Sequence, residues 1–394
     1  MSQALLKRLD DRLEESRNTG ALKRFRTLES PIGARVFITG HGEVLLFASN
    51  DYLGLANHPE VTEAGQDAIC RYGAGTASAR FICGTFAPHL ALERALADFL
   101  GRPDAVTFSS CWAANTALIP VICQDGDVIL SDELNHASLI DGCRMAGKET
   151  RRFVYPHSDM AALAALLEEH REAPARFIIT DGVFSMEGDL AKLDEIVSLA
   201  RRFDAIVIAD DAHGIGTVGS TGGGVVEHYD VRASVDIITG SLGKALGGAA
   251  GGFVAGPTAV VESLKQFGRP HLFSNALPVS VASSTHKALD ILANAPEMVK
   301  ELSNKASYFR QIMGEAGISP IEGSTPIVPV VIGDTSKAMA VSEMLLDKGV
   351  FVTGLGYPVV PEGTARLRFQ VSLSHSSEQL NTAVTCLQEV LDTL

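Results

Sequence analysis

The 394-residue chain lacks most features that mark secreted, metal-binding or membrane proteins. Its six cysteines are scattered, no two are spaced as Cys-x-x-Cys, and no His-Glu-x-x-His motif occurs. We therefore expect no zinc site, and we expect reduced thiols and a cytoplasmic location. The first residues form a charged amphipathic pattern without the apolar core of a signal peptide, and the uncharged stretches 105–124 and 245–261 are broken by polar residues, glycine or proline. A membrane span is not expected.

Positive charge is also in short supply. Lys and Arg number 33 against 47 Asp and Glu, which gives a net charge of −14. This balance argues against a partner such as duplex nucleic acid or an anionic membrane, because both need a cationic face. It leaves room for a local basic pocket that takes a phosphate or a carboxylate. With 46% hydrophobic and 20% charged residues, the chain is long enough to bury a large core.

From about residue 57, short apolar runs alternate with helical patterns. Runs such as FIIT and AIVIA are apolar throughout, which is typical of strands buried on both faces. Strand–helix alternation of this kind predicts an α/β fold with a mostly parallel sheet sandwiched by helices. The predicted strands are 105–108, 127–130, 152–155, 176–180, 205–209, 235–239 and 252–255.

Changes in the pattern of predicted strands and helices divide the chain into three parts. Residues 1–56 are predicted to form an N-terminal arm, 57–285 a large α/β domain, and 286–394 a small α+β C-terminal domain. Near the second boundary, a long helical stretch is predicted over 279–316. Strands over 327–332, 350–353 and 365–370 follow, with a helix near 337–348 and a last helix at the end of the chain.

Two charged residues stand near strand ends, where ligands bind in open α/β sheets. Asp210 follows the strand over 205–209, and Lys244 stands in a loop of small residues after the strand over 235–239. A desolvated lysine can form a Schiff base, and a buried aspartate needs a cationic partner. Taken alone, Lys244 is better explained as an exposed loop residue. The alternative for Asp210 or Asp211 is a helix N-cap.

Other polar residues also stand in or near predicted strand ends, where a ligand could bind. The segment 109–112 starts a helix and offers free backbone N–H groups to an anion, although a serine N-cap explains it more simply. His136 could stack on a planar ring or be structural, and Ser185 could bond a phenolic oxygen or cap the next helix. Arg366 and Arg368 share one face of a strand and suit a carboxylate, or form a surface salt bridge.

The order of these elements decides between the explanations. Four successive strand ends supply a helix start, a histidine, a serine and an aspartate; a lysine follows, and an arginine comes from the C-terminal region. Together these groups match what a pyridoxal phosphate enzyme needs. The run HGIGTVG is similar to a dinucleotide-binding loop, but no strand-to-helix unit with an acidic residue at the required spacing follows. A dinucleotide-dependent oxidoreductase is therefore the weaker hypothesis.

Seven motifs carry a family resemblance: Ser49–Gly54, Arg80–Thr85, Asn135–Ser138, Asp181–Asp189, Asp210–Gly214, Ser241–Lys244 and Arg366–Arg368. Together they make the chain similar, over nearly its whole length, to the α-oxoamine synthases, which are fold-type I pyridoxal phosphate (PLP) enzymes. Segments such as RFICGT and SDELNHASLIDG are most like the branch that joins glycine to acetyl-CoA. Three positions depart from it and bear on the acyl donor. Trp112–Asn115 stands for an aromatic-Asp-Ala-Asn, Ser241 for a threonine, and Asp210–Gly214 looks like the 8-amino-7-oxononanoate branch.

The resemblance implies a role for each candidate residue. Lys244 holds the cofactor and moves the α-proton of the amino acid, while Asp210 pairs with the pyridinium nitrogen. Asn50 and Arg368 bind the carboxylate of the amino acid. The resemblance also implies that His136 stacks on the cofactor ring and that Ser185 and His213 bond its phenolic oxygen. The implied phosphate contacts are the N–H groups of Cys111 and Trp112, the side chain of Ser241 and, across a dimer, Ser274.

The resemblance further implies condensation of glycine, or another small amino acid, with an acyl-CoA, acetyl-CoA being the favoured donor. The alternative is an 8-amino-7-oxononanoate synthase or another transferase of longer acyl chains, with decarboxylation. A non-catalytic subunit of the same fold is a third hypothesis, which the intact Lys244, Asp210 and His136 oppose. A homodimer with shared active sites is implied as well.

Overall fold

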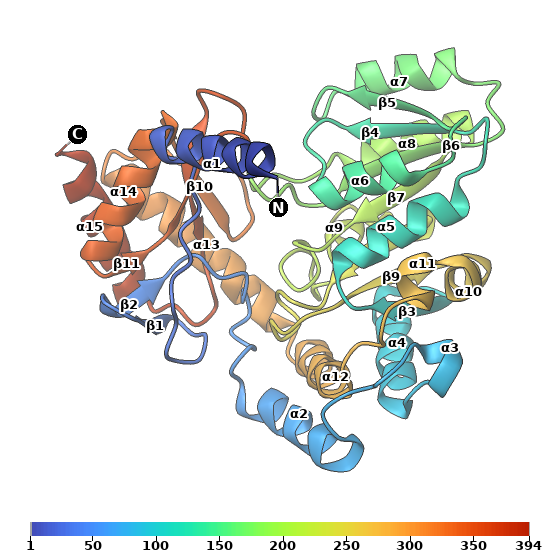
Figure 1. The fold of residues 1–394 in the computed structure, drawn as a ribbon, viewed down its shortest axis with the longest axis horizontal. Coiled ribbons are helices and arrows are strands. Elements are labelled where there is room, and N and C mark those ends of the chain that lie inside the picture. The colour runs from blue at the N-terminus through green and yellow to red at the C-terminus, as the bar shows by residue number, and fades with distance from the viewer. Residues whose placement is uncertain (1, 394) are drawn as a thin grey trace. The chain divides into compact units, whose positions relative to one another are not determined.

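The computed structural model describes residues 2–393, which form two compact units (Figure 1). One unit contains the chain up to Ser49, the short segment Met186–Gly188, and the chain from Leu302 onward. The other contains Asn50–Ser185 and Asp189–Glu301. The division into an arm, a large domain and a small domain at residues 56 and 285 stays a prediction.

A seven-stranded sheet forms the centre of the larger unit, in the order β3-β9-β8-β7-β6-β4-β5. Only β9 runs antiparallel to its two neighbours, and the other strands share one direction. The mostly parallel α/β sheet predicted from the sequence is therefore confirmed. Its strands are β3 (Asp104–Phe108), β4 (Val128–Asp132), β5 (Arg151–Tyr155), β6 (Arg176–Asp181), β7 (Ile206–Asp210), β8 (Ile237–Ser241) and β9 (Gly252–Gly256).

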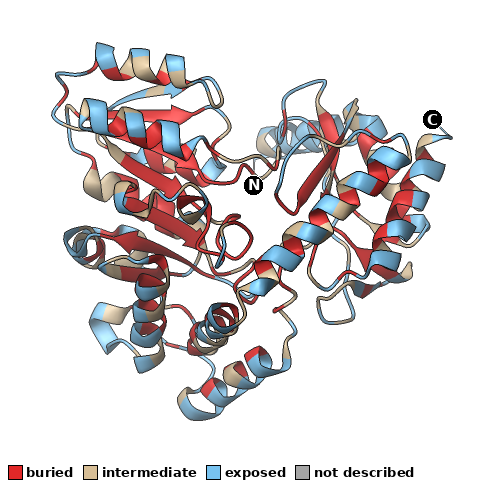
Figure 2. Ribbon diagram, turned by 180° about the vertical axis from the view of Figure 1, so that it is seen from behind, coloured by how far each residue is buried: buried red, intermediate tan, exposed pale blue. Residues whose placement is uncertain are grey.

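Both faces of this sheet are covered, which is why its strands are apolar throughout. Phe177 and Ile179 belong to a core cluster with residues of α5, α6 and α10, whereas Ile178 points to the opposite face and is equally buried. Figure 2 shows the strands in the colour of buried residues and the helices with exposed outer faces. The covering helices are α5 (Cys111–Ile122), α6 (Ala137–Met145), α7 (Met160–Glu169), α8 (Leu193–Phe203) and α10 (Thr258–Phe267).

The helical stretch predicted over 279–316 is confirmed, and the structure divides it into two helices. Helix α12 (Val279–Asn294) ends before Pro296, and α13 (Glu297–Glu315) begins after it. Proline has no N–H and disfavours helical geometry in the preceding residue, and Ala295 has φ −135° and ψ 60°. From Leu302 onward, α13 belongs to the smaller unit. The other helices of the larger unit are α2 (Pro59–Tyr72), α3 (Arg80–Cys83), α4 (Ala87–Leu100), α9 (Val225–His228), the 3₁₀ turn Arg232–Ser234 and α11 (Arg269–Leu272).

The smaller unit contains two three-stranded sheets. Strands β1 (Arg35–Ile38) and β2 (Gly42–Leu46) form a hairpin that is joined by β11 (Val350–Phe351). The other sheet has the order β10-β13-β12. One strand predicted over 350–353 is therefore wrong, since β11 and β12 belong to different sheets. The remaining elements are α1 (Gln3–Asn18), β10 (Ile327–Gly333), α14 (Thr335–Asp347), β12 (Thr353–Leu355), β13 (Ala365–Gln370) and α15 (Ser377–Leu391).

Within residues 2–393, no helix combines the length and the apolar character that crossing a bilayer requires.

Candidate active site

Three aspartates end three adjacent strands at one edge of the large sheet. Asp132 ends β4, Asp181 ends β6 and Asp210 ends β7, and the last two are paired in register. All three are at most 5% exposed. Parallel strands present their carboxyl ends at the same edge, so this edge collects buried negative charge. Asp181 was not predicted as a site residue, although its place at a strand end is the same signal that singled out Asp210.

The Asp210 carboxylate is held by two hydrogen bonds and one sulfur contact. Oδ2 accepts a hydrogen bond of 2.5 Å from Nδ2 of Asn115, and Oδ1 accepts one of 3.0 Å from the N–H of Ala212. The Cys111 sulfur lies 3.5 Å from Oδ2. The second bond is the turn contact expected of a capping aspartate, but the first comes from α5, far along the sequence. The sequence pattern gave no signal for this role of the fully buried Asn115.

Lys244 lies in the loop after β8 and is half-buried. Its positive charge lowers the pKa of three neighbouring groups, those of Cys111, His136 and Asp181. Burial nevertheless raises the pKa of Asp181 and of the Cys111 thiol well above their usual values, and the charge of Asp210 adds to this rise. Asp181 therefore senses the charges of both Asp210 and Lys244, and a positive charge such as a protonated pyridine nitrogen fits a site with two buried carboxyl groups.

The start of helix α5 has backbone N–H groups that would suit an anion. Ser110 caps the helix, and its hydroxyl accepts a hydrogen bond of 3.0 Å from the N–H of Ala113. The N–H groups of Cys111 and Trp112 have no acceptor among the described residues. Strand β9 passes so close that a Cβ on Gly252 would lie 2.4 Å from the nitrogen of Cys111. A phosphate fits free N–H groups at the positive end of a helix dipole.

Two histidines lie in the same unit as the aspartates. The N–H of His136 donates to Oδ2 of Asp181 at 2.9 Å, and Nδ1 lies 2.7 Å from the Ser138 hydroxyl. Burial lowers the pKa of His136, so its imidazole is neutral at pH 7 and suited to stacking. His213 is 9% exposed, and its Nδ1 lies 2.9 Å from the hydroxyl of Tyr52, a residue that was not predicted as a partner.

Four further candidates belong to the larger unit, three in loops and one, Ser241, at the end of β8. Ser185 and Ser274 are half-buried, in the loop after β6 and in the loop between α11 and α12. The hydroxyl of Ser241 accepts a hydrogen bond of 3.2 Å from the N–H of Gly243. The side-chain oxygen of Asn50 accepts one of 3.3 Å from Tyr52.

The two arginines of β13 belong to the smaller unit. Both contact Met186, Arg366 through the backbone carbonyl at 3.0 Å and Arg368 through the sulfur at 3.9 Å. Arg366 also forms a 3.1 Å ion pair with Glu187, and its side chain is 5% exposed. This ion pair is therefore buried, not the surface salt bridge that was the simpler expectation.

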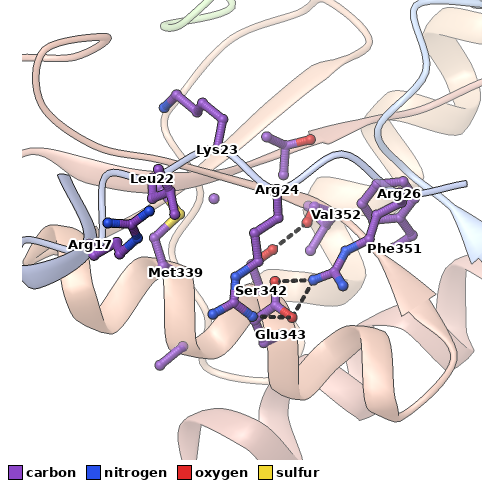
Figure 3. A pocket seen from close by; sticks show the side chains of 14 residues that line it. Arg17, Leu22, Lys23, Arg24, Arg26, Met339, Ser342, Glu343, Phe351 and Val352 are labelled. Atoms are coloured by element: carbon purple, nitrogen blue, oxygen red, sulfur yellow. Dashed lines mark hydrogen bonds and ion pairs between the residues drawn. The ribbon is translucent and has the colours of Figure 1, made fainter. Parts of the chain in front are cut away.

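The smaller unit also contains a basic cavity of about 400 Å³ (Figure 3). In it Arg24 and Arg26 both point toward Glu343, and Arg26 hydrogen-bonds to both oxygens of that carboxylate. Arg17 and Lys23 add positive charge to the lining, so this acidic chain does contain a local basic pocket. The residues predicted to bind the cofactor are not among those that line it.

A family model described as "Aminotransferase class I and II" matches residues 42–387. The chain belongs to this family. It is 44% identical, over 98% of its length and 96% of the relative's, to the 2-amino-3-ketobutyrate coenzyme A ligase of Salmonella typhimurium. It is 42% identical, over 97% and 96%, to the 8-amino-7-oxononanoate synthase of Thermoanaerobacter pseudethanolicus. The resemblance predicted from the sequence is confirmed.

A solved structure extends the similarity to the fold. The chain matches a serine palmitoyltransferase from S. paucimobilis, solved with a bound PLP–myriocin aldimine, with a TM-score of 0.92 and 28% identity. The match covers 99% of this chain and 98% of the other. The fold is therefore that of fold-type I PLP-dependent transferases, as expected.

Proposed function

We propose that the chain is a PLP-dependent C-acyltransferase that condenses glycine with acetyl-CoA to give 2-amino-3-ketobutyrate and CoA. The observation that carries this proposal is the 44% identity, over almost the whole length of both chains, to a 2-amino-3-ketobutyrate coenzyme A ligase. Three features support it: the buried aspartates at the strand ends, Lys244 with its charge acting on Asp181, and the open start of α5. Together they suit a cationic ring that carries a phosphate.

Each candidate residue then has a task that its surroundings favour. When bound, PLP supplies an electron sink for the negative charge that develops on the α-carbon of the amino acid. Asp210, oriented by Asn115 and by the N–H of Ala212, keeps a proton on the ring nitrogen. Lys244 holds the cofactor covalently at rest and takes the α-proton of glycine during the reaction.

The other residues bind and orient. Neutral His136 packs against the ring, and Ser185 and His213 hydrogen-bond its phenolic oxygen, His213 being oriented by Tyr52. Asn50 and Arg368 bind the carboxylate of the amino acid. The phosphate is received by the N–H groups of Cys111 and Trp112 and by the hydroxyl of Ser241, with Ser274 acting across a dimer.

Substitution of Lys244 and of Asp210 tests this assignment. Borohydride treatment of the wild-type protein with PLP should fix one cofactor mass on the peptide that contains Lys244, and Lys244→Ala should lose this label. Asp210→Asn should retain PLP but lose glycine condensation by at least about a hundredfold, because the ring nitrogen would lose its proton. Labelling of another lysine, or normal turnover by Asp210→Asn, would contradict the proposal.

A longer acyl donor is the second candidate, favoured by the 42% identity to an 8-amino-7-oxononanoate synthase. Assays of glycine, alanine and serine against acetyl-CoA and longer acyl thioesters separate the two. The first candidate predicts the highest kcat/KM for glycine with acetyl-CoA. A preference for alanine with a long dicarboxylic thioester, accompanied by release of carbon dioxide, would favour the second.

We also propose that the enzyme works as a homodimer in the cytoplasm. Large apolar side chains gather at α3 and at the ends of α10 and α11, which contact one another in turn. Phe81 is 62% exposed, Ile82 68%, Phe267 68% and Phe273 73%. An exposed apolar patch of this kind marks a protein interface, and Phe273 adjoins Ser274, the residue implied to act across the dimer.

A further inference from the structure

His157, in the loop between β5 and α7, links two aspartates that come from separate parts of the chain. Its Nδ1 lies 2.9 Å from Oδ1 of Asp132, and its Nε2 lies 2.9 Å from Oδ2 of Asp189. A carboxylate can only accept hydrogen bonds, so both ring nitrogens must carry a proton for both bonds to form. We call this arrangement, Asp132–His157–Asp189, the His157 bridge.

The charge state of His157 agrees with this geometry. Burial alone lowers its pKa, but the hydrogen bonds to Asp132 and Asp189 outweigh that effect and raise the pKa to about 10. The imidazole therefore carries its positive charge at neutral pH. Hydrogen bonds between charged partners are stronger than neutral ones, so the bridge is a firm connection between the two aspartates.

On one side, the bridge fixes the turn that leads to His136. Asp132 ends β4, its Oδ1 also accepts a hydrogen bond of 2.9 Å from the N–H of Leu134, and its Oδ2 accepts one of 3.0 Å from Ser158. At the far end of the turn, the N–H of His136 donates to Asp181. The turn over 132–136 is thus anchored at both ends, and His157 supplies the anchor at its start.

On the other side, the bridge fixes the loop that contains Ser185. The N–H of Phe184 donates to the carbonyl of Asp189 at 3.0 Å, which brings the two ends of this loop together. The fully buried Phe184 ring meets the His157 ring edge-on, with 4.3 Å between centroids. His157 therefore contacts the residue before Ser185 as well as the aspartate that closes the loop.

We infer that His157 is a positioning residue for the cofactor site, because it connects the turn that carries His136 to the loop that carries Ser185. The inference rests on the proposed function, which places both residues against the cofactor ring. His157 itself touches neither cofactor nor substrate in this account. It acts through the two aspartates, and it does so only while both of its nitrogens are bonded.

The test compares His157→Gln with a matched substitution elsewhere in the unit. A glutamine can keep one hydrogen bond but cannot reach both aspartates or carry the charge. We expect its PLP dissociation constant, from titration of the apoenzyme, to rise about tenfold. We also expect the visible circular dichroism of the bound cofactor to change, and kcat to fall more than KM rises.

His170→Gln is the control: His170 is buried and stacks on Phe153 at 4.2 Å, and its removal should leave cofactor binding unchanged.

A double substitution tests whether the effect passes through the bridge. Asp189→Asn should weaken PLP binding in the same direction, and combining it with His157→Gln should add little, because both changes break one connection. Additive effects would overturn the inference. So would a lower melting temperature for His157→Gln with unchanged PLP affinity and circular dichroism, since that is the result of a purely structural role. These readouts use PLP without substrates, so a wild type that binds PLP but does not condense glycine would overturn the proposed function and leave this test intact.

Discussion

Asp210 and Asp211 are neighbours in the chain, but their carboxylates have different partners. Asp210 is bonded by Asn115, and its charge raises the pKa of Asp181 on the neighbouring strand. Asp211 is fully buried, and its Oδ2 accepts a hydrogen bond of 2.7 Å from the N–H of Val225, where α9 begins. Burial raises the pKa of Asp211 to about 7. Both aspartates therefore accept a backbone hydrogen bond, Asp210 from the turn that follows it and Asp211 from the start of α9, and only Asp210 is also bonded by Asn115.

The crowded surroundings of the Asp211 carboxylate explain why the segment that follows it is rich in glycine. A Cβ on Gly214 would lie 1.9 Å from Oδ1 of Asp211, and a Cβ on Gly224 would lie 1.8 Å from Oδ2. Gly224 also has a positive φ of 83°, which disfavours other residues. Gly214 is the first glycine of the run HGIGTVG, which is similar to a dinucleotide-binding loop. Packing against Asp211 explains why a glycine is needed at this position.

The charge of His157 predicts a pH dependence of stability. Its pKa is about 10 in the folded chain and about 6.5 when unperturbed. The stabilisation that it provides is therefore fully present below about pH 6.5 and is lost as the pH rises through about 10. Between pH 7 and pH 10, the free energy of unfolding of the apoenzyme should fall by roughly 2–4 kcal/mol more in the wild type than in His157→Gln. Urea unfolding at both pH values measures this, and parallel curves for the two proteins would contradict it.

Among the secondary-structure elements, the close contact between β9 and the start of α5 predicts that a larger residue at Gly252 is destabilising. Gly252→Ala would place a methyl group 2.4 Å from the nitrogen of Cys111, against backbone that cannot yield locally. We expect a loss of about 3 kcal/mol or more in stability and weaker PLP binding, because the helix start must shift. Gly75→Ala is the control, since nothing lies within 4 Å of its Cβ position. Thermal unfolding and PLP titration of both variants check the prediction, and unchanged PLP affinity in Gly252→Ala would contradict it.

The elements of the sheet could be predicted from the sequence because their signal is local. Buried parallel strands are apolar at every position, and all seven strands were found to within a few residues. Finer divisions were not predicted, for physical reasons. The helical pattern continues on both sides of Pro296, so the break between α12 and α13 was not specified. The split between β11 and β12 depends on which strands they pair with, and no local pattern contains that information.

The same distinction holds for the candidate site. The rule that ligands bind at strand ends singled out Asp210, and it applies equally to Asp181 and Asp132. The partners Asn115 and Tyr52 come from other elements, so only the folded chain shows them. The roles assigned to Lys244 and the other candidates stay predictions until the cofactor is seen in place.

At the scale of the whole molecule, the exposed apolar patch predicts how copies of the chain associate. Phe273→Glu places a charge in the patch formed by Phe81, Ile82, Phe267 and Phe273. We expect this variant to sediment as a monomer at concentrations where the proposed wild-type dimer forms. Glycine condensation should also be much lower, because the proposed action of Ser274 across that dimer would be lost. Phe25→Glu is the control, since Phe25 is 97% exposed and lies in the other unit. A dimeric Phe273→Glu would show that the interface lies elsewhere.

The single reversed strand has a consequence for the timing of biosynthesis. Strand β3 is the first of the seven to leave the ribosome, yet its partner in the sheet is β9, the last. Until residue 256 has emerged, the edge of β3 is unpaired and the anion-receiving start of α5 lacks the strand that passes beside it. Pairing so distant along the chain is slow, and an open edge invites aggregation. The nascent chain should therefore acquire affinity for its cofactor abruptly, and only after about two thirds of its translation.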